Sequence, residues 1–116
     1  FVEDAIEPRG LIRSNIEHLE FTGITKLFKR DATNLGPMKR FQPFNLVFLD
    51  PPYNKELGEK ALSSAIEGNW LADTALIILE ESKSAPITWP KGVVLLDKKN
   101  YGETTLYYAK WQAKSE

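Results

Sequence analysis

A short apolar segment that stops at a rigid turn does most to limit the folds open to this chain. Residues 45–49 form a continuous, almost wholly apolar run of strand length, and Asp50, Pro51, Pro52 and Tyr53 follow directly. Such a run is typical of a parallel strand that is buried on both faces of a sheet. Two consecutive prolines fix the backbone and cannot continue a central strand, so the chain must turn there.

Strand and helix patterns alternate around this segment. The other expected strands are short apolar or alternating runs at residues 1–2, 26–30, 75–79, 93–96 and 104–111. The expected helices carry apolar side chains three or four positions apart, at residues 8–22 and 57–66. This order predicts one α/β domain with a mainly parallel sheet that helices cover on both faces. Asn100, Tyr101 and Gly102 mark the turn of a terminal antiparallel hairpin.

Composition removes several classes of function. The chain has 116 residues, enough for about one domain, and its net charge of −1 lacks the overall basic character of a nucleic-acid binder. Without cysteine there is no disulfide scaffold, thiolate metal site or cysteine nucleophile, and His18 alone cannot form a metal cluster. No apolar run approaches a membrane span and no signal-peptide pattern opens the chain. We therefore expect a cytoplasmic enzyme or binding module that uses no metal.

The residues of the turn suit chemistry on an aromatic amine. An exocyclic amine is a poor nucleophile because its lone pair is delocalised into the ring. An acceptor beside it can turn the lone pair toward a methyl donor and stabilise the charge that develops on nitrogen. Asp50 and the Pro51 carbonyl can serve as acceptors, Pro52 helps to fix that carbonyl, and Tyr53 offers a flat face for an extruded base. The structural alternative is a stiff turn in which Asp50 caps the next helix and Tyr53 packs as an ordinary aromatic.

With this turn in its context, the chain resembles the RsmD-like group of bacterial small-subunit ribosomal RNA guanine-N2 methyltransferases. The similarity extends over nearly all of the chain. Residues 1–3, 45–53, 75–80 and 99–107 look like the family's second strand, its fourth strand with the catalytic loop, its fifth strand and its terminal hairpin. The resemblance implies a Rossmann-like class I methyltransferase sheet. It also implies transfer of a methyl group from S-adenosylmethionine to guanine N2 of ribosomal RNA, alone or in the small ribosomal subunit, without a metal.

The resemblance also assigns cofactor roles to residues that follow two other strands. Glu3 matches the acid that accepts hydrogen bonds from the cofactor ribose, which is a common use of an acid at a strand end. Asp31 matches the residue that binds the adenine amino group, and the backbone N–H of Ala32 the one that binds a ring nitrogen. Without the family pattern, Glu3 could equally be a solvated acid and Asp31 a residue that starts a loop.

Two small basic and aromatic groups are weaker candidates for RNA contact. Lys39 and Arg40 precede Phe41, and residues 98–99 precede Tyr101. Such side chains can bind phosphates and stack on bases, although they are more often simply solvated surface. We include Lys39 and Arg40 among the predicted substrate-binding residues.

The pattern departs from the family in one respect. No Gly-rich loop follows a buried strand, although class I methyltransferases bind the methionine end of the cofactor there. We therefore expect residues 1–116 to be the C-terminal part of the domain, with the central first strand missing, a gap or rearrangement in the sheet, and weak cofactor binding by this part alone. Two alternatives remain open: an adenine-N6 methyltransferase of DNA or RNA, and a non-catalytic module with the same fold.

Overall fold

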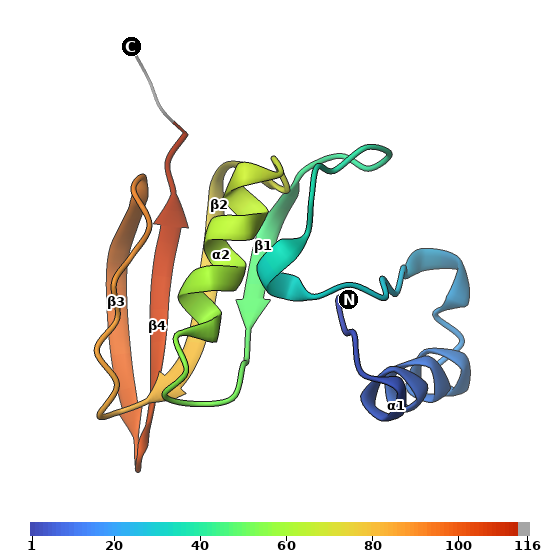
Figure 1. The fold of residues 1–116 in the computed structure, drawn as a ribbon, viewed down its shortest axis with the longest axis horizontal. Helices are drawn as coiled ribbons and strands as arrows, with labels where there is room; N and C mark the ends of the chain where they lie inside the picture. Colours follow the sequence, from blue (N-terminus) through green and yellow to red (C-terminus); the bar gives the residue numbers. More distant parts are fainter. Residues whose placement is uncertain (114–116) are drawn as a thin grey trace.

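The computed structural model describes residues 1–113, and its centre is a four-stranded sheet in the order β1-β2-β4-β3 (Figure 1). The strands are β1 (Phe44–Leu49), β2 (Leu71–Ser82), β3 (Val93–Tyr101) and β4 (Thr104–Trp111). β1 pairs with β2 in parallel, whereas β4 pairs antiparallel with both β2 and β3. The predicted α/β class and the terminal hairpin are confirmed, and the sheet is mixed.

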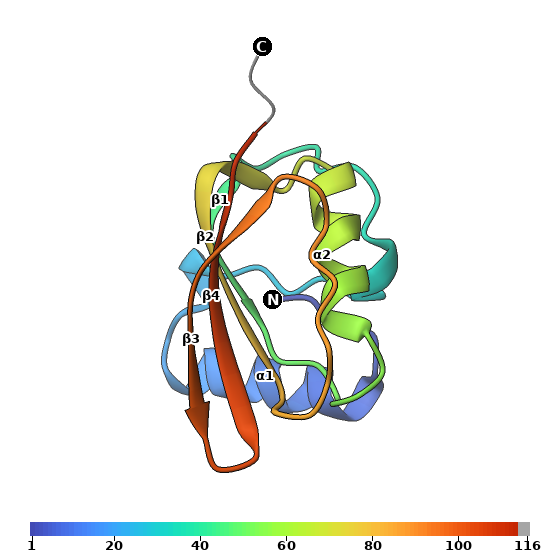
Figure 2. The same ribbon diagram turned by 90° about the vertical axis from the view of Figure 1, so that its left-hand side faces the viewer.

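Two helices accompany the sheet, α1 (Ile6–His18) and α2 (Leu57–Glu67), with short 3-10 turns η1 (Thr22–Ile24) and η2 (Ala32–Asn34). α2 connects β1 to β2 and lies against one face of the sheet (Figure 2). Among residues 1–113, no helix is both long enough and apolar enough to cross a membrane.

The core lies between α2 and the sheet. Leu62 of α2 and Ile77 and Leu79 of β2 are fully buried. Leu62 and Ile77 belong to one buried cluster, and Ala61 and Ala65 beside Leu62 on the helix are small, so the helix lies close to the strands. Each fully buried side chain of this size contributes about 1.5–3 kcal/mol relative to an exposed one.

The chain that follows α2 is held by hydrogen bonds to the loop that follows η2. Gly68 ends α2, and its carbonyl accepts a hydrogen bond from the Met38 N–H at 2.9 Å. Trp70 donates its indole N–H to the Gly36 carbonyl at 2.8 Å and packs edge-on against Phe28 at 5.4 Å between ring centroids. These contacts join three distant parts of the chain at the amino end of β1 and β2.

The prediction that β1 is buried on both faces is wrong. Leu46 is 55% exposed and Phe48 60% exposed. α2 covers one face of this strand, and among the described residues 1–113 no strand pairs with its outer edge. A sequence run shows how apolar a strand is, but not whether other segments cover it.

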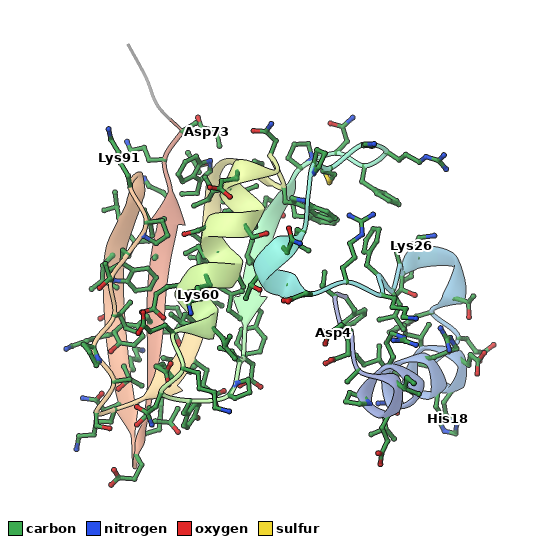
Figure 3. The ribbon with its side chains drawn as sticks, in the orientation of Figure 1. Asp4, His18, Lys26, Lys60, Asp73 and Lys91 are labelled. Carbon is green, nitrogen blue, oxygen red and sulfur yellow. The ribbon has the colours of Figure 1, made fainter. Side chains whose placement is uncertain are left out.

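The prediction that helices cover both faces of the sheet is also wrong for the described chain. None of the residues of α1 is buried, and Leu11 on its apolar side is 65% exposed. α1 stands apart from the sheet in Figure 1. In Figure 3, His18 lies on the side of α1 that faces away from the sheet. The strands expected at residues 1–2 and 26–30 are reduced to one parallel bridge between Val2 and Phe28. Among residues 1–113, no strand lies between this bridge and β1.

Candidate active site

The predicted turn lies where the parallel strands end. β1 stops at Leu49, and Asp50 to Tyr53 carry the chain away from the carboxyl edge of the sheet, where open α/β sheets bind their ligands. Asn54 and Glu56 both take positive φ values, 63° and 57°, which few residues adopt without support from the surrounding structure. α2 begins directly after Glu56, so Asp50 does not cap this helix. The turn is a tightly bent segment between β1 and α2.

A groove of about 500 Å³ brings the predicted cofactor and catalytic residues together. Glu3 and Asp31, from the two segments of the Val2–Phe28 bridge, line it on one side. Asp50 lines it from the end of β1. Ala32, Pro51 and Pro52 complete the set of predicted site residues in the lining. The groove runs along the open edge of β1, in the space that separates the bridge from the sheet.

The environment of Asp50 favours a basic carboxylate. Asp50 is exposed overall, but the desolvation of its partly covered carboxyl group raises its pKa above the ordinary value, and the negative charge of Glu80 raises it further. A carboxylate of higher basicity is a better hydrogen-bond acceptor, provided that it remains ionised. The site therefore places a strengthened acceptor at the tip of β1.

Tyr53 turns away from the lining of the groove and toward the other strands. Its hydroxyl donates to Glu80 Oε2 at 2.5 Å and lies 2.9 Å from Thr104 Oγ1. The hydrogen bond to Glu80 is the main reason why the pKa of Tyr53 is raised. The sequence does not assign Glu80 or Thr104 to the site. The available signal was the pair of acids that ends the strand predicted at residues 75–79.

Asp31 and Glu3 each use one oxygen for a local contact. Asp31 Oδ1 accepts the backbone N–H of Thr33 at 2.8 Å and its hydroxyl at 2.7 Å, and these bonds lower the pKa of Asp31. Glu3 Oε2 accepts the N–H of Ala5 at 3.1 Å. In both residues the contacts involve a single oxygen, so the second oxygen is available to a ligand.

The predicted substrate residues Lys39 and Arg40 do not join this cluster. They lie in the loop before β1, at the opposite end of the strand from Asp50. The six residues of β1 span about 20 Å at roughly 3.3 Å per residue. Both side chains are exposed and line a second hollow with Phe41 and Arg30, and Arg30 also lines the groove that holds Asp50. Their contact with RNA stays a prediction.

Comparison with known proteins places this arrangement in a class and then in a family. The mixed sheet, with acids at its strand ends, has the Rossmann-like fold of the class I methyltransferases. The chain belongs to the family described as Conserved hypothetical protein 95, whose model matches residues 1–110. This confirms the family resemblance inferred from the sequence.

The relatives described below are all named as methylases or methyltransferases. The match to the crystal structure of a "putative methylase" from Haemophilus influenzae covers 97% of this chain and 71% of the chain in that structure, with a TM-score of 0.82 at 28% identity. An "uncharacterized methylase" from Rickettsia prowazekii is 30% identical over 99 residues, which are 80% of this chain and 42% of that protein. Ribosomal RNA small subunit methyltransferase D of Haemophilus influenzae is 44% identical over 59 residues, 51% of this chain and 31% of its own length. The chain thus spans less than half of either curated relative.

Proposed function

We propose that this protein transfers a methyl group from S-adenosylmethionine to the exocyclic N2 of a guanine in small-subunit ribosomal RNA. The observation that carries the proposal is the shared groove, because Asp50 of the turn lines the same hollow as Glu3 and Asp31. The names of the relatives support methyl transfer as the reaction and ribosomal RNA as the substrate.

The side chains that line the groove fit the cofactor in chemistry. Glu3 can accept hydrogen bonds from ribose hydroxyls, and Asp31 can accept one from an adenine amino group. The apolar side chains of β1, including Val47 and Leu49, offer a surface for the flat adenine. When bound there, S-adenosylmethionine supplies the methyl group that is transferred.

The residues of the turn prepare the amine. Asp50 and the Pro51 carbonyl accept its hydrogens, which directs the nitrogen lone pair out of the base plane and stabilises the positive charge that forms on nitrogen. The two prolines hold the carbonyl in place before the base arrives, so little reorganisation is needed at the moment of reaction. After transfer, Asp50 is the nearest of the named groups to take up the proton that the amine loses.

Replacement of Asp50 by Ala in the full-length protein tests the assignment. Loss of one preorganised partner of the developing charge is expected to lower kcat by about 10²–10³-fold. The affinity for S-adenosylmethionine should stay within about twofold, because in this proposal Glu3 and Asp31 hold the cofactor. The measurements are tritiated methyl transfer to small ribosomal subunits and calorimetric titration of the cofactor.

Asp97→Ala is the matched control, because Asp97 is an exposed carboxylate on β3. It should leave both quantities unchanged. Full activity in Asp50→Ala would refute the role of Asp50. If the unaltered protein methylates naked DNA as fast as small ribosomal subunits or faster, with the label on adenine, the proposal of a guanine substrate is refuted.

A further inference from the structure

Two consecutive acids at the end of β2 hold two consecutive residues of the catalytic turn. Glu80 accepts the hydroxyl of Tyr53 at 2.5 Å, and Glu81 Oε1 accepts the backbone N–H of Asn54 at 3.0 Å. Neighbouring side chains of a strand point to opposite faces of the sheet. The turn therefore passes around the end of β2 and is held from both sides.

The two acids differ in burial, and the difference separates their roles. Glu81 is 1% exposed and also accepts the N–H of Ser82 at 2.6 Å, so it belongs to the framework. Glu80 is only half-buried, and its contact is with a side chain that the reaction uses. Thr104, the first residue of β4, lies 2.9 Å from the same hydroxyl. The orientation of the Tyr53 ring is thus set by groups on two other strands.

We propose that Glu80 is a positioning residue for Tyr53, whose carboxylate fixes the phenol hydroxyl and with it the plane on which the target base stacks. This inference rests on the proposed function, because the orientation of the ring matters to catalysis only if a base stacks on it. Glu80 acts through Tyr53 and need not touch the base or the cofactor.

A charged acceptor suits this purpose. Hydrogen bonds to an ionised carboxylate are shorter and roughly twice as strong as those between neutral groups. Without the bond, the hydroxyl of Tyr53 would keep only its contact with Thr104, and the ring would be less well ordered before a base binds. A site that is held in advance avoids that entropic cost.

Three variants of the full-length protein separate positioning from simple structural support. In Glu80→Gln the amide oxygen can still accept the hydroxyl, whereas Glu80→Ala and Tyr53→Phe both remove the bond. We expect kcat/KM for methyl transfer to fall about tenfold in the last two and about threefold or less in Glu80→Gln. Cofactor affinity should not change in any of them.

The double variant Tyr53→Phe with Glu80→Ala gives the sharpest kinetic result. Both changes delete the same hydrogen bond, so the double variant should be no slower than the slower single variant. Losses that multiply would overturn the proposal, because they would mean that Glu80 acts independently of Tyr53. Comparable circular dichroism spectra and thermal midpoints are required of each variant.

A titration that needs no substrate tests the contact itself. The hydrogen bond to Glu80 raises the pKa of Tyr53, so Glu80→Gln should lower it. The signal is the near-ultraviolet absorbance of phenolate, with Tyr53→Phe subtracted to remove the other tyrosines. Glu103→Gln is the control, since it removes the same charge one residue before Thr104 without contacting Tyr53.

The titration of Tyr53 and the methyl-transfer assay together distinguish failure of the positioning role from failure of the proposed function. An unchanged Tyr53 pKa in Glu80→Gln would overturn the positioning role even if methyl transfer were normal in the unaltered protein. A lowered pKa combined with no methyl transfer by the unaltered protein would refute the proposed function, and with it any catalytic role for Glu80, while the contact would stand.

Discussion

Substitution of Gly68 by Ala should destabilise the domain although the backbone there accepts any residue. The φ of Gly68 is −87°, so Ala causes no torsional strain at this position. A β-carbon at Gly68 would collide with the Gly36 carbonyl oxygen and would lie 2.8 Å from two atoms of the Trp70 indole. The first of these is a backbone atom and the second belongs to a buried ring, so neither can move aside at small cost.

The expected loss of folding free energy follows from the contacts that the added methyl group disrupts. Overpacking of a filled site costs about 1–3 kcal/mol. The hydrogen bond from the Trp70 indole to Gly36, now 2.8 Å long, would be lost or stretched at a further cost of about 1 kcal/mol. A total near 3 kcal/mol corresponds to a decrease in Tm of about 12 °C for a domain of 116 residues.

Thermal unfolding followed by far-ultraviolet circular dichroism measures this decrease, and urea unfolding gives the free energy. Gly10→Ala is the matched control, because Gly10 lies inside α1 and a β-carbon there meets no atom within 4 Å. It should raise stability by about 0.5–1 kcal/mol through helix propensity. A Tm of Gly68→Ala within about 2 °C of the unaltered protein would show that the packing around Trp70 can relax, contrary to this reasoning.

Two further predictions concern the groove. Because desolvation and Glu80 raise the pKa of Asp50 and only the carboxylate accepts the amine, kcat should fall as the pH drops through that raised pKa. Glu80→Gln removes one of the two causes, so this acid limb should move to lower pH, and an unmoved limb would contradict the assignment. Asp31→Asn keeps an amide oxygen for both bonds from Thr33 but loses the charge. It should weaken cofactor binding about tenfold in calorimetry, with a small decrease in Tm because the bonds from Thr33 lose a charged acceptor, whereas an unchanged affinity would remove Asp31 from the cofactor site.

The fold was predictable where the signal is local. The apolar run before Asp50 gives β1, the helical spacing after Tyr53 gives α2, and the turn at Gly102 gives the hairpin. β2 begins earlier than predicted, at Leu71, and includes an irregular stretch of its pairing with β1 in which Thr74 has a positive φ of 64°. Its length is set by pairing with two neighbours, which no local pattern contains.

The residues proposed for the site came from a local motif and from the family resemblance. Asp50 was proposed because its neighbours along the chain define the motif, and Glu3 and Asp31 because they match residues of the family that the chain resembles; their roles remain predictions. Glu80 was not proposed, because its partner Tyr53 is 27 positions away and only the packed structure brings them together. Lys39 and Arg40 fit a composition typical of RNA contact, but composition carries no information on which end of β1 they occupy.

The contact between Tyr53 and Thr104 joins positions 51 residues apart, so it has a consequence for the order in which the site is built during synthesis. A ribosome that has released β1, α2 and β2 has already produced the whole Asp50–Tyr53 motif and Glu80, yet the hydroxyl of Tyr53 still lacks Thr104, the second of its two partners. That partner emerges only with the last strand, and bringing it back across the sheet requires closure of a long loop. A nascent chain can thus carry the complete motif before it holds the ring in its final place.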